Sequence, residues 1–375
     1  MRIAVLGAGM VGRTIAADLS AFFDVTAVDK NAGSLALCKQ RNPSVTVMPF
    51  DFSVPTALAE ILKPFELVVV AVPGFLGFEV LKQVIMAGKN TVDISFSSED
   101  ALQLDALARE QQVTAIVDCG VAPGMSNLVL GRYNEEMSVD AFECYVGGLP
   151  KFRKKPFEYK APFSPVDVIE EYTRPARVME NGYMVTRDAL TETELMEFDG
   201  IGTLEAFNTD GLRSLLNTMR HIPNMKEKTL RYPGHAELIT ALQRSGFFDK
   251  DEIMCEGTAI SPLKYTTAVL FKEWALLPGE EEFTVMKIVV KGEQNGRRKT
   301  VEYALLDHYD THTQTTSMAR STGYTCTAAV HLLAKKLFAE PGVFPPEKIG
   351  KYESCFSFVL QHLKERNVVW TKKEW

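Results

Sequence analysis

A short bend with the sequence VDCGVAPGMSN, residues 117–127, sets an aspartate and a cysteine directly before two glycines and a proline. A carboxylate held beside such a bend can act as a general base, or it can hold the amine of a substrate. Aspartate is equally common as an acceptor of hydrogen bonds from the backbone of its own turn. Residue type alone leaves these roles of Asp118 open.

A second glycine-bearing bend lies at the N-terminus, in RIAVLGAGMVGRT. Gly7, Gly9 and Gly12 form the pattern GxGxxG between an expected strand and an expected helix. The first glycine permits a tight turn, the second lets the backbone approach a pyrophosphate, and the third lets the helix pack on the strand. The helix start then offers unpaired N–H groups to the phosphates. The pattern predicts a dinucleotide site, and a glycine turn without a ligand is the alternative.

An acid roughly 20 residues beyond the glycines decides which dinucleotide fits. Asp29 ends the expected second strand, where its carboxylate can accept hydrogen bonds from both ribose hydroxyls and would repel a 2′-phosphate. Lys30 beside it weakens that preference. We therefore expect NAD, with NADP less favoured. The residues expected to contact the cofactor are Gly7, Ala8, Gly9, Met10, Val11, Gly12, Asp29, Lys30, Asp51, Phe52, Val72, Pro73 and Ser95.

Alternating strands and helices must position both bends. Further strands are expected at 44–52, 65–74, 91–95 and 114–120, and helices at 78–90 and 99–112. This alternation predicts an α/β fold with a doubly wound parallel sheet. Ligands of such sheets bind at the carboxyl ends of the strands. The bend at 117–127 should therefore be an exit loop over the nicotinamide rather than a second phosphate site.

The pattern changes after about residue 125. Alternating runs at 283–293 and 298–309 flank QNGR, and Asn295-Gly296 predicts a type I′ hairpin. Helices are expected at 211–219, 235–246 and 263–277, and an apolar helix at 322–338. These elements predict a mixed sheet covered by helices, inserted into the nucleotide-binding domain.

Polar residues in this second half are candidates for binding an amino acid. Asn208, Thr209 and Asp210 stand at an expected helix N-terminus, with Arg213 one turn inside it, and Arg174 lies in YTRPARV. A carboxylate needs an arginine fork or a helix N-terminus, and an ammonium needs a carboxylate. Each arginine is open to the simpler interpretation of a solvated or structurally paired side chain.

Histidines give two further hypotheses. His235 follows Gly234 at an expected helix start, where the helix dipole would keep the imidazole neutral and able to take a proton from an ammonium. It can equally be a packed residue. On a strand, His308, Asp310 and His312 would share one face and could bind a metal. A polar sheet face explains these three more simply, so no metal is predicted.

Composition limits the class of protein. The 375 residues allow two domains, and the apolar content of 46% is typical of a globular chain. A net charge of −7 argues against nucleic acid or anionic membrane as a partner. Neither a signal peptide nor a membrane span is expected. Six single cysteines without a CxxC pair predict reduced thiols in a cytoplasmic protein.

Seven segments together resemble the saccharopine dehydrogenase family, in the family's order and over nearly the whole chain. They are AVLGAGMVG, VVVAVPGF, VDCGVAPGMSN, YVGGLP, TDGLRSLL, LRYPGHAELI and MARSTGYTCTAAV. Within the family the sequence is most similar to the lysine 6-dehydrogenase branch. The resemblance implies a Rossmann domain, a second α+β domain inserted before a returning C-terminal helix, and oxidation of a C–N bond by NAD(P). The expected boundaries are 1–125, 126–320 and 321–375.

The resemblance also implies an amino-acid site at Ser95, Phe96, Asp118 and the corner 208–210, and it favours a homodimer. The first hypothesis is NAD-dependent oxidation of the ε-carbon of L-lysine. Asp118 or His235 would serve as the base, and Arg213 and Asp210 would hold the α-amino-acid end. The alternatives are a saccharopine-type reductase that joins an aldehyde to an amino acid, with KFRKKPF as an anion site, and a catalytically silent NAD-binding protein.

Overall fold

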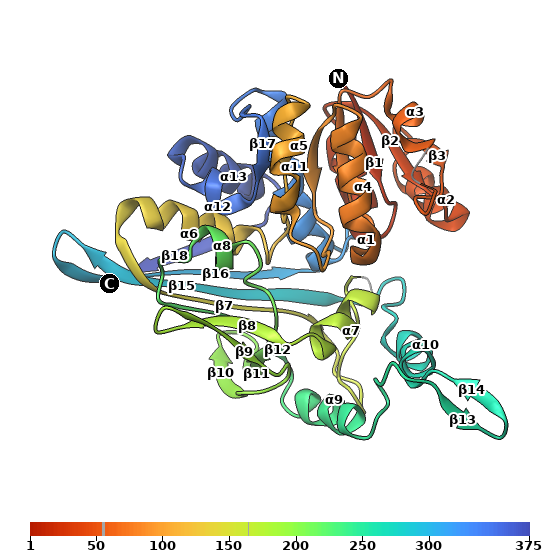
Figure 1. Cartoon of the computed structure of the whole chain (residues 1–375), viewed down its shortest axis with the longest axis vertical. Coiled ribbons are helices and arrows are strands. Elements are labelled where there is room, and N and C mark those ends of the chain that lie inside the picture. Colours follow the sequence, from red (N-terminus) through yellow and green to blue (C-terminus); the bar gives the residue numbers. More distant parts are fainter. Residues whose placement is uncertain (55–56, 164) are drawn as a thin grey trace.

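The computed structural model describes residues 1–54, 57–163 and 165–375. In these ranges the strands form a seven-stranded sheet, a nine-stranded sheet and a two-stranded hairpin. Figure 1 shows the first sheet and its helices at one end of the molecule and the second sheet below it. No helix in the described part of the chain combines the length and the hydropathy needed to cross a membrane.

The first sheet is parallel throughout, in the order β17-β6-β5-β4-β1-β2-β3. Its strands are β1 (Arg2–Leu6), β2 (Asp24–Asp29), β3 (Thr46–Pro49), β4 (Leu67–Val70), β5 (Asn90–Asp93), β6 (Thr114–Ile116) and β17 (Gly342–Phe344). The helices between them are α1 (Met10–Ser20), α2 (Ala32–Arg41), α3 (Leu58–Leu62), α4 (Gly74–Met86) and α5 (Asp105–Glu110). The predicted doubly wound sheet is confirmed.

The strand order reverses at β1, which lies between β2 and β4. The loops that follow β1 and β4 therefore leave the sheet side by side, and a crevice opens between them where ligands of this fold bind. The N–H of Ala71 donates to the carbonyl of Leu6 at 2.8 Å, which ties the two loops together. The order of the strands thus brings the glycine loop beside residues 71–73.

The C-terminal segment adds one strand, β17, to the first sheet and another, β18 (Trp370–Glu374), to the second sheet. Helix α11 (Ser317–Ala334) packs on α1, and a Cβ at Gly323 would lie 3.4 Å from Ile15. After α11 come β17, α12 (Pro346–Gly350) and α13 (Glu353–Glu365). Strand β17 is too short to have been predicted. The chain does not stay with the first sheet to its end as expected, because β18 pairs with the second sheet.

The second sheet is mixed. Its strands are β7 (Ser138–Pro150), β8 (Ala176–Glu180), β9 (Tyr183–Arg187), β10 (Glu194–Phe198), β11 (Gly202–Asn208), β12 (Asn224–Arg231), β15 (Glu282–Gln294), β16 (Arg297–His308) and β18. The helices are α6 (Met125–Glu136), α7 (Pro165–Thr173), α8 (Leu215–Thr218), α9 (His235–Arg244) and α10 (Pro262–Trp274). The hairpin β13 (Ile253–Cys255) and β14 (Thr258–Ile260) projects outward in Figure 1. Asn295 and Gly296 have φ of 54° and 74°, so the predicted type I′ turn is confirmed.

Two strands of this sheet face the nucleotide-binding half with their carboxyl ends. Strands β7 and β12 are parallel neighbours, and Val146 pairs with Thr229. A continuous apolar core that includes residues of α1, α6, α11 and both sheets joins the two halves. Because that core is shared, the ends of β7 and β12 are held opposite the crevice of the first sheet.

Candidate functional site

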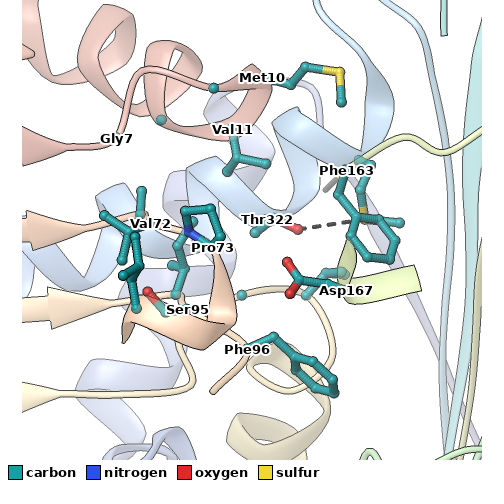
Figure 2. Close-up of a pocket in the computed structure, with 18 of the residues that line it drawn as sticks. Gly7, Met10, Val11, Val72, Pro73, Ser95, Phe96, Phe163, Asp167 and Thr322 are labelled. Carbon is teal, nitrogen blue, oxygen red and sulfur yellow. Dashed lines mark hydrogen bonds between the residues drawn. The ribbon is translucent and has the colours of Figure 1, made fainter. Parts of the chain in front are cut away.

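A cavity of about 590 Å³ lies between the first sheet and the ends of β7 and β12, and Figure 2 shows part of its lining. This volume is within the range of about 300–1,000 Å³ common for small-molecule sites. From the first half the cavity is lined by Gly7, Gly9, Met10, Val11, Gly12, Arg13, Asp29, Lys30, Asp51, Phe52, Val72, Pro73, Ser95, Phe96, Asp118 and residues 120–123. From the second half it is lined by residues 146–148, Phe163, Asp167, Glu171, Thr229, Arg231, Met318 and Thr322.

The three glycines of the first bend have different physical roles. Gly7 has φ of 107°, and a Cβ there would lie 2.3 Å from the carbonyl oxygen of Ala71. A Cβ at Gly12 would lie 2.0 Å from the carbonyl oxygen of Gly7. At Gly9, by contrast, a Cβ would meet no described atom within 4 Å. Gly7 and Gly12 are therefore required by packing, whereas Gly9 keeps space open at the start of α1. That open space and the helix N-terminus fit a pyrophosphate.

Asp29, the last residue of β2, lies at one end of the cavity. Its Oδ2 accepts from the N–H of Ala8 at 2.7 Å, and its Oδ1 accepts from the N–H of Asn31 at 2.8 Å. Ala8 itself does not appear in the cavity lining; it holds the carboxylate in place. The Lys30 ammonium lies 3.7 Å from a carboxylate oxygen of Asp51, and both side chains are largely exposed. Arg13 and Ser34 also line this end, and the sequence did not single them out.

The second bend closes the far end of the crevice. A Cβ at Gly124, which has φ of 143°, would lie 1.7 Å from the carbonyl oxygen of Gly120, so the bend requires glycine. Asp118, directly before it, has φ of 52° and is 8% exposed. Val72, Pro73, Ser95 and Phe96, which Figure 2 labels, line the same cavity as Asp118. The two bends thus line one cavity, and the second presents a carboxylate to it.

Asp118 is bound by an arginine from the second half of the chain. The Arg213 Nε donates to Asp118 Oδ1 at 3.0 Å, and its Nη1 donates to the carbonyl of Ser97 at 2.6 Å. The guanidinium also lies 4.8 Å from the centroid of the Phe96 ring. Arg213 does not appear in the cavity lining. It positions the Asp118 carboxylate rather than facing a substrate.

The predicted corner 208–210 does not itself line the cavity, although the hydroxyl of Thr209 lies 2.9 Å from that of Thr229, which does. Asp210 is bonded by Arg177, with Nη2 to Oδ2 at 2.8 Å, and the hydroxyl of Thr209 donates to Glu227 at 2.7 Å. Asn208 ends β11 and donates to Glu192 at 3.0 Å. The expected helix start is wrong, because α8 begins only at residue 215. These three residues therefore hold the loop together in this structure.

Two other predicted residues also lie outside the cavity lining. Arg174 pairs with Glu170 at 3.1 Å, and its guanidinium lies 5.3 Å from the ring centroid of Phe96. His235 begins α9 as predicted, but its ring is buried, with Nε2 3.0 Å from the Tyr172 hydroxyl and Nδ1 2.9 Å from the carbonyl of Phe157. A ring enclosed in this way is a packed residue, and it does not line the cavity.

The buried imidazole predicts an acid-sensitive fold. Burial, aided by the charge of Arg231, lowers the pKa of His235 to about 3, against an ordinary value of 6.5. The unfolded chain therefore binds a proton that the folded chain refuses, so stability falls as pH drops from 6.5 toward 3. From pH 7.5 to 5 the histidine should cost about 2 kcal/mol of unfolding free energy. Urea unfolding at both pH values should show a smaller loss in His235→Gln, and equal losses would contradict the assignment.

The sequence missed the wall that the second half contributes. Helix α7 brings Asp167 and Glu171, and β12 brings Thr229 and Arg231. A usable signal was present in PVDVIEEYT, where a proline at a helix start precedes two acids four residues apart. Arg231 lies in LRYPGHAELI but reaches the cavity only because β12 pairs with β7.

In DHYDTHTQ, Asp307 and His308 end strand β16, and residues 311–314 form a turn. Asp310 accepts from the N–H of His312 at 2.9 Å and pairs with Arg320 at 3.1 Å. Among the residues that the structure describes, no group of three or more His, Cys, Asp or Glu side chains could hold a metal ion. The six cysteines all lie in the described ranges and are free thiols.

Comparison with known proteins gives two family matches that together span most of the chain. The saccharopine dehydrogenase NADP binding domain matches residues 3–116, and the saccharopine dehydrogenase C-terminal domain matches residues 120–368. Carboxyaminopropylagmatine dehydrogenase of a Synechocystis strain is 22% identical over 93% of this chain and 92% of its own. Alpha-aminoadipic semialdehyde synthase of Arabidopsis thaliana is 24% identical over 66% of this chain. The match spans only 25% of that synthase.

Solved structures share the fold. Apo saccharopine dehydrogenase (L-Glu forming) from Saccharomyces cerevisiae has a TM-score of 0.80 at 18% identity, covering 100% of this chain and 99% of its own. Homospermidine synthase from Legionella pneumophila, in complex with NAD, has a TM-score of 0.69 at 12% identity, covering 100% and 91%. A nicotinamide dinucleotide is the cofactor class that these matches support.

Proposed function

The chain belongs to the saccharopine dehydrogenase family, and on that premise we propose that it oxidises the ε-carbon–nitrogen bond of L-lysine with NAD. One observation carries the proposal. The Asp118 carboxylate lines the same cavity as the glycine loop, at the carboxyl ends of the strands where a nicotinamide would lie. A carboxylate in that place can accept the proton of a substrate amine.

Different residues of the cavity lining would bind the cofactor and the substrate. The glycine loop and the start of α1 would hold the pyrophosphate, Asp29 the adenosine ribose, and Val72, Pro73 and Ser95 the nicotinamide end. When bound there, NAD supplies a hydride acceptor. The walls formed by Phe96, Phe163 and Met318 would contact the methylenes of the substrate and keep water from the reacting carbon.

Proton transfer falls to Asp118 in this proposal. An ammonium has no lone pair to stabilise the iminium that develops as hydride leaves the carbon, so the amine must first lose a proton. Asp118 takes that proton, and Arg213 holds the carboxylate in one orientation through the Nε to Oδ1 bond of 3.0 Å. Water then hydrolyses the imine, ammonia leaves, and the semialdehyde cyclises.

A steady-state assay with L-lysine and NAD tests the proposal. We expect NADH and ammonia in equal amounts, with the rate rising from neutral toward alkaline pH as the amine loses its proton more readily. If neither product forms over a broad pH range, lysine oxidation is rejected. A protein that binds NAD but turns over no amino acid in a panel would then fit the silent-binder hypothesis.

The runner-up is a saccharopine-type reaction, which the names of several relatives favour. It would need a further anion site for the carboxylates of glutamate. The basic run KFRKKPF does not line the cavity. Its cations have partners elsewhere: Lys151 pairs with Glu281, and Arg153 and Lys155 pair with Glu158. Consumption of NADH or NADPH only when an aldehyde and an amino acid are both present would favour this alternative over lysine oxidation.

The adenosine end predicts a preference for NAD over NADP. Both oxygens of Asp29 are fixed by backbone N–H groups, so the carboxylate stays where a 2′-phosphate would lie. We expect NAD to bind at least about tenfold more tightly than NADP, from a charge repulsion of roughly 1.4 kcal/mol or more. In Asp29→Asn the ratio of the affinities for NAD and NADP should be smaller than in the unchanged protein. Fluorescence titration with NADH and NADPH measures it, and an unchanged ratio in the variant would contradict the role of Asp29.

The division of the chain at 1–125, 126–320 and 321–375 and the homodimer also stand as proposals. Light scattering on the purified protein measures the mass in solution. A mass of one chain at micromolar concentration would reject the dimer.

A further inference from the structure

The wall of the cavity that α7 contributes is richer in carboxylates than in cations. Asp167 and Glu171 lie four residues apart, so both side chains are on one face of the helix, and both line the cavity. Asp118 lines the cavity from the bend that follows β6. The cation that lines the cavity from the second half of the chain is Arg231. Figure 2 shows the carboxylate of Asp167 directed toward Pro73 and Ser95.

Arg231 is poorly placed to receive a substrate carboxylate. Its Nε donates to the Tyr172 hydroxyl at 3.1 Å, and its Nη2 donates to Glu171 at 3.0 Å and to the Tyr159 hydroxyl at 3.4 Å. Its Nη1 donates to the carbonyl of Leu230 at 3.0 Å. Four of the five N–H donors of this guanidinium are thus engaged, and the residue is 2% exposed. A bidentate fork for a carboxylate would require breaking these bonds.

The two carboxylates of α7 repel each other at this wall. Burial raises the pKa of Glu171 above its ordinary value; Arg231 opposes that rise, and the negative charge of Asp167 adds to it. A cation placed between the two acids would relieve this repulsion. Substrates that bring only carboxylates to the wall would increase it.

Resting on the proposed function, we propose that Asp167 and Glu171 bind a second ammonium group of the substrate. The substrate class is then a diamino compound whose other amine reaches Asp118. For a diamino acid, the α-ammonium lies at α7 and the side-chain amine lies at the nicotinamide end. Asp167 and Glu171 are specificity-determining residues in this assignment, and the chemistry remains with Asp118.

Three ligands separate the groups that the wall could recognise. L-Lysine has two ammonium groups and a carboxylate, 1,5-diaminopentane lacks the carboxylate, and 6-aminohexanoate lacks the second ammonium. Calorimetric titration in the presence of NADH measures their binding without requiring turnover. We expect lysine and diaminopentane to bind, and 6-aminohexanoate to bind about 10- to 100-fold more weakly, the value of one charge-assisted hydrogen bond.

The variant Asp167→Asn keeps the size of the side chain and removes its charge. It should weaken the binding of lysine and diaminopentane about tenfold or more. The binding of 6-aminohexanoate should not weaken, because its carboxylate would no longer be repelled by the charge of Asp167. Glu170→Gln is the matched control, since Glu170 lies on the same helix, is exposed, and does not line the cavity. Thermal unfolding of both variants checks that α7 remains folded. Asp167→Asn leaves both partners of the Glu171–Arg231 ion pair in place.

The outcomes separate this inference from the proposed reaction. Diamines that bind through Asp167 without being oxidised would reject the reaction and support the inference. Lysine oxidation with equal binding of 6-aminohexanoate, or equal effects of Asp167→Asn and Glu170→Gln, would overturn the inference and leave the reaction standing. Tighter binding of saccharopine or glutamate than of lysine or diaminopentane would overturn the inference, and so would absence of diamine binding.

Discussion

Asp118→Asn should lower kcat for lysine oxidation about 10²- to 10⁴-fold, the usual contribution of a general base. Asparagine keeps the size of the side chain and the oxygen that accepts from Arg213 Nε, but it cannot take a proton. Cofactor affinity should change little, because Asp118 is in the second bend and the proposed pyrophosphate site is in the first. Stopped-flow or steady-state NADH formation measures the loss, and thermal unfolding confirms the fold.

The pH dependence distinguishes a base from a residue that only holds the substrate. As pH rises toward about 10, near the pKa of a free lysine amine, the substrate deprotonates without help. The deficit of Asp118→Asn should therefore shrink with rising pH if Asp118 is the base. Asp24→Asn is the control, since Asp24 is exposed at the start of β2 and does not line the cavity. A deficit that is constant with pH would assign Asp118 to binding alone, and full activity would remove it from the site.

Gly9→Val should abolish most cofactor binding while leaving the fold intact. Gly9 has φ of −64° and ψ of −168°, a conformation open to any residue, and its added Cβ would meet no described atom within 4 Å. The side chain would instead occupy the space where a pyrophosphate approaches the start of α1. Losing two charge-assisted hydrogen bonds there predicts a fall in NADH affinity of at least about 100-fold.

The neighbouring glycine provides the contrast for this experiment. In Gly12→Ala the Cβ would lie 2.0 Å from the carbonyl oxygen of Gly7, so this variant should lose stability as well as cofactor affinity. The melting temperature of the cofactor-free protein and a fluorescence titration with NADH separate the two effects. Unchanged NADH binding by a folded Gly9→Val protein would show that the pyrophosphate does not lie at this loop.

The first half of the chain was readable because its signals are local. A glycine turn is specified by residues next to one another, and buried strands and amphipathic helices by periods of a few residues. The rule that ligands bind at the carboxyl ends of parallel strands placed Asp118 at that edge of the sheet, and the resemblance to the family added Ser95 and Phe96. The structure brings these residues into the cavity, and the resemblance to the family added the substrate class.

The second half resisted the same reasoning because its geometry depends on distant partners. Asp210 has a carboxylate, which could bind an ammonium group. In the structure that carboxylate is paired with Arg177, which is distant in the sequence. His235 was correctly placed at a helix start, yet the side chains of Tyr172 and Trp274 enclose its ring. Arg231 and Glu171 meet only where β12 pairs with β7 and α7 lies beside them.

Residues close together in the chain were enough to specify the first six strands of the nucleotide-binding half, the two bends and the type I′ hairpin, since each of these elements has a local sequence signal. Which side chains of the second half face the cavity was settled by the pairing of strands β7 and β12 and by the position of α7. Those contacts join segments separated by tens of residues, and periodicity within one segment carries no information about its distant partner.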